Sequence, residues 1–366
     1  MRQNIKWLIL LILFVFSCKQ NERINFPITE LNKTQVLSDT LNWAKIVEGC
    51  YTDIFTVDSL LILIARCDSD YIHIYNKYTL QFFKKIGKKG NAPHEFARPV
   101  RYNSQSTTSN NSSIIFFDTH VGYNKCVDFQ KIMSNVNFAS CVDEKAVDTE
   151  LLACHNINLI NDNTVAMQSI DVSEGIFMLY NPQTKNKKWV DYYPIMNFEN
   201  KREYISVYYG SIHANVCKDR IVYASRHFDE ILFFDINGKL ISGSIFSMLK
   251  RPIIETKFKG VSHDSEIFFL SMCSTKQLIY ILRVNQSTNQ LIKEPKTPMQ
   301  IVVFDWEGTL HEVYELNIFP HLFYVDEDSN TLYVLRANSE ENDFTSEIFM
   351  FALINSNAKT ALNQTH

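Results

Sequence analysis

The sequence predicts an all-β protein that is built from repeated small sheets. Short runs rich in Val, Ile, Phe and Tyr recur between turn residues, and no long stretch of the mature chain shows a sustained 3.6-residue period. Aromatic residues make up 13% of the chain, which favours strands over helices. The strand pattern also repeats along the chain, and this repeat distinguishes between the all-β architectures.

Each repeat has a turn residue, an apolar run, a polar break and a second apolar run. The six runs that open the repeats start 46 to 65 residues apart, at Asp58, Ser112, Asn163, Asp219, Ser265 and Asn330. An inner strand before each opening run and an outer strand after the second run give four strands per repeat. Radial repetition of four-stranded antiparallel sheets is a β-propeller, so the sequence predicts a six-bladed β-propeller.

The turns and the chain ends complete this prediction. Asn237-Gly238 and Glu307-Gly308 place a glycine between alternating strands, where a hairpin requires a positive φ. The last repeat leaves little room for an outermost strand. We therefore expect residues within Ile24–Glu48 to supply that strand and to close the ring.

The N-terminus predicts export and a lipid anchor. Arg2 and Lys6 precede the ten-residue apolar run Trp7–Phe16, and Ser17 and Cys18 follow it. Ten helical residues span about 15 Å, which is too short for a hydrocarbon core of about 30 Å but typical of a signal peptide. A cysteine directly after a small residue at this point is similar to the bacterial lipobox, in which the cysteine is acylated. We therefore expect lipidation of Cys18.

These signals divide the chain into three parts. Residues 1–17 are the expected lipoprotein signal peptide, and residues 18–35 are a lipid-anchored tether that can include the closing strand. Residues 36–366 form the expected propeller.

The lysine and arginine total of 36 against 40 acidic residues gives no electrostatic reason to expect a nucleic-acid partner. The glycine-rich nucleotide-binding motifs are absent as well.

The mature chain has seven cysteines besides Cys18, and none of them has C-x-x-C spacing. An odd number, with most members inside apolar strand-like runs, predicts neither a disulfide framework nor a zinc ribbon. We expect buried free thiols.

The segment "GKKGNAPHEF" after the first repeat supplies a family resemblance. Together with the lipobox and the six repeats, it resembles the TolB-like or NHL-like six-bladed propeller lipoproteins of Bacteroidetes, which have a segment of the form G-x-x-G-x-G-P-x-E-F there. The residues that match are Gly87, Gly90, Pro93, Glu95 and Phe96, while Ala92 stands where the family often has Gly and His94 where a second Gly is usual. The resemblance implies the propeller fold and an envelope location. We expect the segment to be the crossover between the first two blades, with the second blade starting at Pro99.

Three histidines precede opening runs and are candidate ligands of a divalent metal in the central channel. His155, His213 and His321 lie seven, six and eight residues before the following turn. Imidazoles that converge from the innermost strands could hold zinc, and such a site would make the protein a metal-dependent lyase or hydrolase. The unequal offsets favour unrelated histidines, because a one-residue shift turns a strand side chain to the opposite face.

Other polar and aromatic clusters have simpler interpretations. Arg226–Glu230 and Ser262–Glu266 contain a histidine beside carboxylates, which could act as an acid–base pair, but a turn that faces water is favoured. Asp326–Asn330 lacks the spacing of a calcium loop and predicts a solvated hairpin. The tyrosines of 188–194 and 203–210 could stack on carbohydrate, although packing between blades is favoured.

The function that the sequence favours is a cell-envelope binding module, anchored by its lipid and located at the outer membrane. The ligand is either a small molecule or another envelope component, a protein or a glycan. The metal-dependent enzyme and a scaffold in an envelope transport or glycan-uptake assembly are the alternatives.

Overall fold

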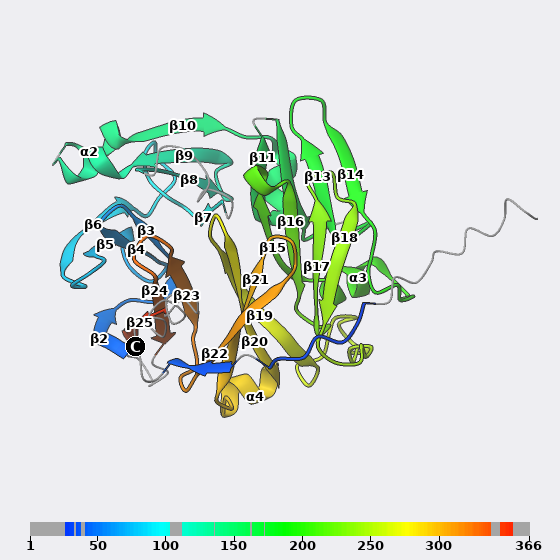
Figure 1. The fold of residues 1–366 in the computed structure, drawn as a ribbon. Helices are drawn as coiled ribbons and strands as arrows, with labels where there is room; N and C mark the ends of the chain where they lie inside the picture. Colours follow the sequence, from blue (N-terminus) through cyan, green and yellow to red (C-terminus); the bar gives the residue numbers. More distant parts are fainter. Residues whose placement is uncertain are drawn as a thin grey trace, which may run out of the picture.

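The computed structural model describes residues 26–32, 34–37, 41–102, 112–134, 136–161, 163–171, 173–337 and 345–353. Six small sheets stand around a central axis and form a six-bladed β-propeller (Figure 1). The predicted fold class is therefore confirmed. The expected signal peptide and Cys18 lie outside the described residues. Within these residues, no helix is long and apolar enough to cross a membrane.

Blades 1 to 3 each contain four consecutive antiparallel strands, innermost strand first. Blade 1 has β3 (Tyr51–Val57), β4 (Leu60–Ala65), β5 (Asp70–Asn76) and β6 (Phe82–Lys88). Blade 2 has β7 (Pro99–Arg101), β8 (Ser113–Asp118), β9 (Tyr123–Asp128) and β10 (Val142–Ala146). Blade 3 has β11 (Cys154–Asn161), β12 (Thr164–Ser169), β13 (Phe177–Asn181) and β14 (Asn186–Val190).

Blades 4 to 6 have the same order, with additions from the N-terminus. Blade 4 has β15 (Gly210–Asn215), β16 (Arg220–Ser225), β17 (Glu230–Asp235) and β18 (Leu240–Ile245). Blade 5 has β19 (Glu266–Ser274), β20 (Leu278–Ser287), β21 (Met299–Asp305) and β22 (Leu310–Leu316). Blade 6 has β23 (Leu322–Asp326), β24 (Thr331–Ala337), β25 (Thr345–Ala352) and, outermost, β2 (Leu41–Glu48).

The N-terminal segment closes the ring as expected, and it also runs past two further blades. β2 pairs antiparallel with β25, so a strand from the start of the chain completes the last blade. Before it, β1 (Thr34–Val36) adds a parallel fifth strand to β22, and Thr29 donates its amide to Ile245 at the edge of blade 4. Figure 1 shows this blue segment passing along the outer strands. It covers backbone edges that would otherwise be unpaired.

Within the described residues, the helices are short and lie in connections. They are α2 (Phe129–Met133), α3 (Lys201–Val207) and α4 (Thr288–Lys293), with 3-10 turns at Phe138–Cys141, Thr149–Ala153 and Val216–Lys218. The α2 helix follows β9 directly. Asp128 ends β9 and accepts the amide of Lys131, and this N-cap starts the helix.

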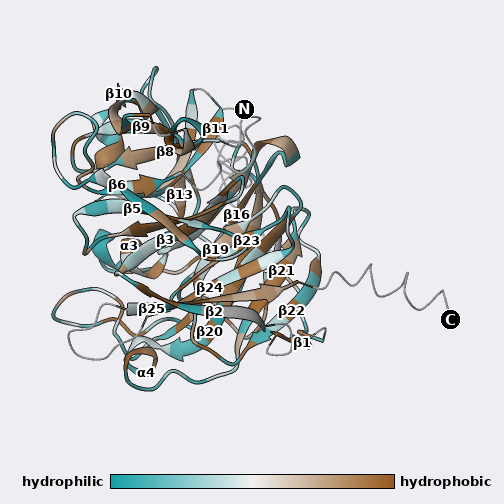
Figure 2. Cartoon of the chain, turned by 90° about the vertical axis from the view of Figure 1, so that its left-hand side faces the viewer, coloured by the Kyte–Doolittle hydropathy of each residue, from teal (hydrophilic) through white to brown (hydrophobic). Residues whose placement is uncertain are grey.

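The hydrophobic core is divided among the blade interfaces. Each of the six buried clusters joins two neighbouring blades; for example, Phe55 and Ile62 of blade 1 pack with Phe116 and Val127 of blade 2. Figure 2 shows the hydrophobic colouring concentrated on the strands. Since each blade buries both faces, a middle strand can be apolar throughout, as is β4, whose six residues are all buried.

The register of blade 5 differs from the expectation. Five of the six opening runs are second strands, but the run at Ser265 forms β19, the innermost strand. The second strand of blade 5 is β20. With β20 in its place, the second strands start at residues 60, 113, 164, 220, 278 and 331, only 51 to 58 residues apart. The real repeat is therefore more regular than the one inferred from the sequence.

Not all cysteines are free thiols. Cys50 and Cys67 form a disulfide with a Cα–Cα distance of 5.6 Å, between the start of blade 1 and its β4–β5 turn. The other described cysteines are free as expected: Cys141, Cys154 and Cys273 are buried, Cys126 is half-buried and Cys217 is exposed. The sequence misses the pair because the 17-residue separation follows no motif.

Candidate functional site

A polar pocket of about 130 Å³ lies in the central channel. The innermost strands of five blades line it, namely β3, β7, β15, β19 and β23. None of its lining residues comes from blade 3. A site assembled from several innermost strands is the usual arrangement of a ligand pocket at the axis of a ring-shaped fold.

A bidentate ion pair occupies one side of the pocket. The Arg101 guanidinium donates from Nε to Asp53 Oδ2 at 2.8 Å and from a terminal nitrogen to Oδ1 at 3.3 Å. It also lies over the Phe55 ring, 4.7 Å from the centroid. Burial lowers the pKa of Arg101, but the Asp53 charge more than offsets this and the pKa is raised. The pair therefore stays charged and presents both a donor plane and carboxylate oxygens.

A second ion pair joins blade 1 to blade 6. Lys77 follows β5, and its Nζ lies 2.8 Å from Oδ2 of Asp326, the last residue of β23. Asp326 Oδ1 accepts from the Thr56 hydroxyl at 3.3 Å, and Oδ2 accepts from the Ser329 hydroxyl at 2.6 Å. Both charged side chains are nearly fully buried. Asp326 is thus no part of a solvated hairpin, which corrects the expectation for Asp326–Asn330.

His213, Ser274 and Cys273 add neutral groups to the wall. His213 Nδ1 lies 2.8 Å from the Ser274 hydroxyl, and burial together with the Arg101 charge lowers the pKa of His213 to about 3. Burial also raises the pKa of Cys273 to about 11, so its thiol stays protonated near neutral pH. A protonated thiol is a poor nucleophile. These residues supply hydrogen-bonding groups and no activated nucleophile.

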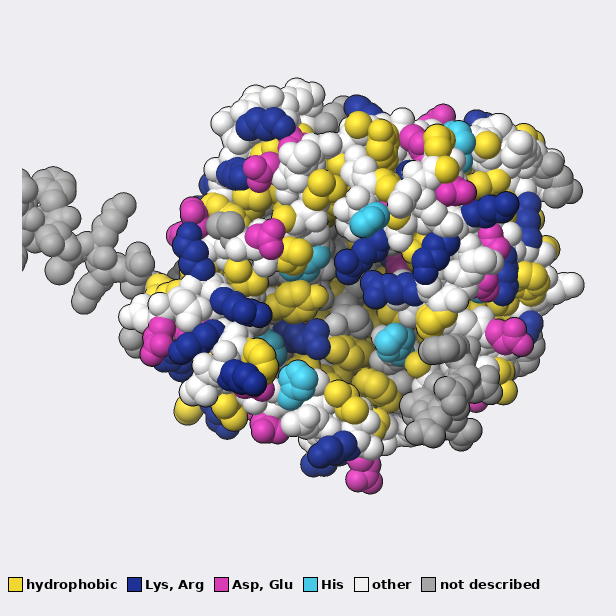
Figure 3. Space-filling view, turned by 180° about the vertical axis from the view of Figure 1, so that it is seen from behind, with side chains coloured by type: hydrophobic (Ala, Val, Ile, Leu, Met, Phe, Trp, Pro, Cys, Tyr) yellow, Lys and Arg dark blue, Asp and Glu magenta, His cyan; other side chains and the backbone are white. Residues whose placement is uncertain are grey.

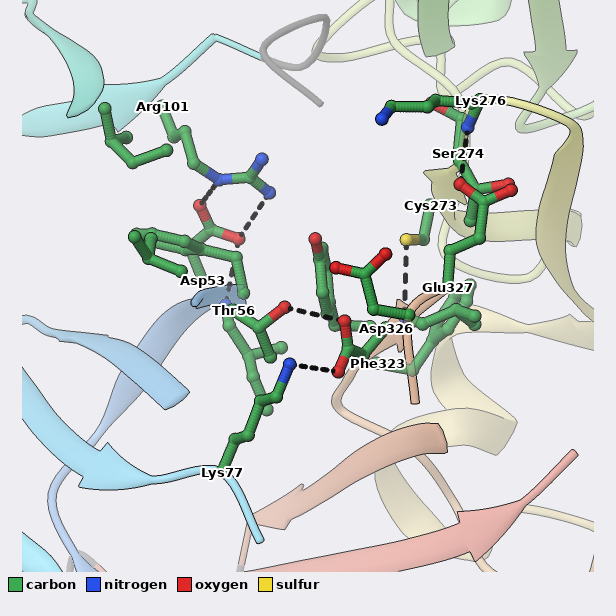
Figure 4. A pocket seen from close by; sticks show the side chains of 18 of the residues that line it. Asp53, Thr56, Lys77, Arg101, Cys273, Ser274, Lys276, Phe323, Asp326 and Glu327 are labelled. Atoms are coloured by element: carbon green, nitrogen blue, oxygen red, sulfur yellow. Dashed lines mark hydrogen bonds and ion pairs between the residues drawn. The ribbon is translucent and has the colours of Figure 1, made fainter. Parts of the chain in front are cut away.

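The mouth of the pocket adds charge. Glu327 Oε2 accepts the backbone amide of Lys276 at 3.1 Å, and Asp328 also lines the pocket. Figure 4 shows Lys276 and Arg101 on opposite sides of the pocket, with the Lys77–Asp326 pair between and below them. The arrangement offers donors and acceptors from several directions.

The structure does not bring the three candidate metal ligands together. Among the described residues, no group of three His, Cys, Asp or Glu side chains could hold a metal ion. His213 lines the channel pocket, whereas His155 stacks on Tyr209 with a centroid distance of 4.9 Å. His321 is exposed and precedes β23. The residues do not fit a shared metal centre, because their side chains have different surroundings.

The family-like segment connects blades 1 and 2. β6 ends at Lys88, and β7 begins at Pro99. Gly87 has a φ of 76°, and a Cβ there would lie 3.1 Å from the ring of Phe96, which is fully buried. Gly90 is closely approached by the Glu95 carboxylate, which accepts the amide of Ala92 at 3.0 Å. Pro93 is exposed in the same turn.

His94 has an unusual backbone conformation in this crossover. His94 has a φ of 64°, a conformation that favours glycine. Its amide donates to Glu144 Oε1 at 2.8 Å, and Glu144 also pairs with Lys125 at 2.9 Å. The crossover is therefore fixed to blade 2 by side chains of β9 and β10.

The other clusters are structural. Asp229 is buried and makes a bidentate pair with Arg283, at 2.9 and 2.7 Å, and the adjacent Glu230 is fully buried. This corrects the expectation that Arg226–Glu230 faces water. Asp264, in the second cluster, accepts from the Asn289 amide at 2.6 Å.

The tyrosine-rich segments mostly pack. Tyr192, Tyr204 and Tyr208 contact one another in the crossover from blade 3 to blade 4, with centroid distances of 4.5 to 6.2 Å. Tyr209 is the exposed member; besides His155, it contacts the Arg226 guanidinium at 5.6 Å. The packing interpretation therefore holds for the three tyrosines of this cluster.

Sequence reasoning missed the charged residues of the channel. Asp53 and Arg101 interrupt otherwise apolar innermost strands, and this interruption was the available signal. Using it would have required knowing which strands are innermost, and the blade 5 register shows how easily that is misjudged.

Comparisons with known proteins support the fold alone. No protein-family model matches the chain, and no curated protein matches it either. A solved structure of a DUF4221 family member from Bacteroides vulgatus is 12% identical, with a TM-score of 0.53 over 85% of this chain and 96% of the other. A putative exported protein from Bacteroides fragilis is also 12% identical, with a TM-score of 0.48 over 88% and 99% of the two chains.

Proposed function

We propose that this β-propeller is a cell-envelope binding protein that takes a small hydroxyl-rich ligand, such as a sugar, in the channel pocket. The observation that carries the proposal is the pocket itself, which five blades line and in which blades 1, 2 and 6 present two ion pairs whose charges are already neutralised. Paired charges do not select a ligand of high net charge. They do offer carboxylate oxygens and guanidinium N–H groups that match hydroxyls, and Phe55 and Tyr324 add aromatic surface to the lining.

The anchor and the location are part of the same proposal. The N-terminal segment with Cys18 supports lipidation and export to the outer membrane. The Cys50–Cys67 disulfide supports an oxidising compartment outside the cytoplasm. Replacing Cys18 by alanine is expected to move the protein from the membrane fraction to the soluble fraction. Unchanged membrane association of the variant would contradict the lipid anchor.

The binding proposal is tested by calorimetry with a panel of neutral monosaccharides and disaccharides. We expect at least one sugar to bind with 1:1 stoichiometry, and Asp53→Asn to weaken it at least tenfold because the variant loses a charged acceptor. Lys187→Met is the control. It removes an exposed lysine on β14, the outermost strand of blade 3, and should bind the sugar normally. Absence of binding across the panel, or equal binding by Asp53→Asn, would refute the proposal.

A further inference from the structure

A second cavity lies at the other end of the innermost strands. It has a volume of about 260 Å³ and is formed at the N-terminal ends of β3 and β7. Its lining residues are Thr52, Ile64, Arg66, Tyr71, Lys89, Ala97, Arg98 and Pro99. None of them lines the channel pocket. We call this cavity the basic pocket.

The basic pocket carries uncompensated positive charge. Arg66, Lys89 and Arg98 line it, and no carboxylate does. Among the described residues, none of these three side chains is in an ion pair, in contrast to Lys77 and Arg101 of the channel pocket. Figure 3 shows Lys and Arg side chains gathered beside the hollow in the middle of that view.

The carboxylate of Asp118 holds the backbone beside the basic pocket. Asp118 is fully buried behind the pocket, and its oxygens accept the backbone amides of Ala97 at 2.8 Å and Arg98 at 2.9 Å. Its carboxylate therefore serves to hold the crossover rather than to pair with a guanidinium. The side chains of Arg66 and Arg98 are exposed and free to contact a ligand.

The backbone that carries the three cations is fixed. The Arg66 amide donates to Cys50 O at 2.9 Å, next to the Cys50–Cys67 disulfide. The Lys89 amide donates to Ser69 O at 2.8 Å, and Asp118 holds Arg98. The Tyr71 hydroxyl also donates to Ala97 O, which ties blade 1 to the crossover. Such preorganisation lowers the entropy cost of binding.

We propose that the basic pocket binds a tetrahedral oxyanion, the phosphate or sulfate group of a small ligand. Three cations from three separate segments match a group with three or four equivalent oxygens better than a planar carboxylate. The two guanidiniums donate paired N–H groups to such oxygens, and the lysine adds a point charge. This inference is independent of the channel ligand, because the two pockets share no residue.

The test is calorimetric titration of the full-length protein in neutral detergent with inorganic phosphate, sulfate and acetate. We expect phosphate or sulfate to bind once per chain, and acetate at least tenfold more weakly. Arg66→Gln and Arg98→Gln should each weaken the oxyanion at least tenfold. Arg220→Gln, which removes a half-buried arginine at the start of β16, is the charge-matched control and should change nothing.

Three results would overturn the proposal: no phosphate or sulfate binding, equal weakening by Arg220→Gln, or unchanged binding by both Arg66→Gln and Arg98→Gln. Circular dichroism of each variant shows whether its fold is retained, and the side chains of Arg66 and Arg98 are exposed. A further titration with phosphatidic acid vesicles identifies the source of the phosphate. Tighter binding of vesicles than of inorganic phosphate, lost in Arg98→Gln, assigns a lipid headgroup, and the reverse order assigns a soluble ligand.

Discussion

Lys77 and Asp326 form a buried ion pair, with Nζ and Oδ2 2.8 Å apart, that connects the first blade of the propeller to the last. The same connection includes the Tyr333 hydroxyl of blade 6, which donates to Lys77 O at 3.0 Å. Ring closure therefore has two components. β2 completes blade 6 at the outer edge, and the ion pair joins blades 1 and 6 at the channel.

Breaking this ion pair should destabilise the ring strongly. Lys77→Met leaves the Asp326 carboxylate buried without its cation, and we expect a loss of about 3–5 kcal/mol in the free energy of unfolding. Lys187→Met removes a partner of the exposed Lys187–Glu150 pair and should cost less than about 1 kcal/mol. Urea denaturation measures both. Similar losses in the two variants would show that the buried pair stabilises the protein no more than the exposed pair does.

The Cys50–Cys67 disulfide should stabilise the start of blade 1. Replacing both cysteines by serine removes the constraint on a 17-residue separation, and we expect a loss of about 3 kcal/mol. Cys217→Ser alters an exposed free thiol and should leave the unfolding midpoint unchanged. The measurement is chemical denaturation with and without reductant. A midpoint of the unsubstituted protein that is insensitive to reductant would argue against the disulfide.

Two positions of the crossover should respond to substitution to different degrees. Gly87→Ala adds a Cβ at a φ of 76°, 3.1 Å from the Phe96 ring, and should destabilise the protein by about 2 kcal/mol. His94→Gly relieves a positive φ but makes the unfolded chain more flexible, so its net effect should stay within about 1 kcal/mol. Thermal unfolding distinguishes the two. A larger loss for His94→Gly would show that the imidazole itself is required.

The buried Glu230 should make stability fall as pH rises. Its carboxyl oxygens have no hydrogen-bond partner in the described part of the chain, and burial raises the pKa of Glu230 well above 4.5. The native state therefore keeps a proton that the unfolded state loses above about pH 4.5, and stability decreases by about 1.4 kcal/mol per pH unit until the native pKa is reached.

Glu230→Gln removes this titration with little change of shape. We expect the variant to gain stability over the parent protein at pH 8 and to differ less from it at pH 4. Denaturation at a series of pH values measures the difference. A constant offset between the two proteins at all pH values would contradict a titration of Glu230.

Protonation of His213 should lower the stability of the protein in the acidic range. The native pKa of about 3 lies below the ordinary value of 6.5, so the unfolded state binds a proton first as pH falls. The stability that the neutral His213 contributes is complete above about pH 6.5 and is lost progressively toward pH 3. The loss amounts to about 2 kcal/mol at pH 5. His213→Gln should flatten the acid limb of the stability profile. Parallel stability profiles of the variant and the parent protein would show that other groups cause the acid sensitivity.

Local chemistry explains why so much of the fold could be predicted. Each blade is specified by apolar runs of strand length and by turn residues such as Asn237-Gly238, whose glycine has the expected positive φ of 79°. The short last repeat predicted a closing strand from the N-terminus, and β2 is that strand. The disulfide was not predictable, because no local pattern indicates which cysteines approach each other.

By itself, the sequence determined the number of blades, the closing strand and the crossover at Gly87–Pro99, because these follow from strand period, turn chemistry and chain length. Only the tertiary structure decided which charges meet. Asp326 appeared as one acid in a polar turn, yet it is buried against Lys77 from the other end of the chain. The physical reason is that a one-residue shift of register turns a side chain from the channel to the blade interface. The contents of the channel therefore depend on strand pairing between distant segments, which local patterns do not encode.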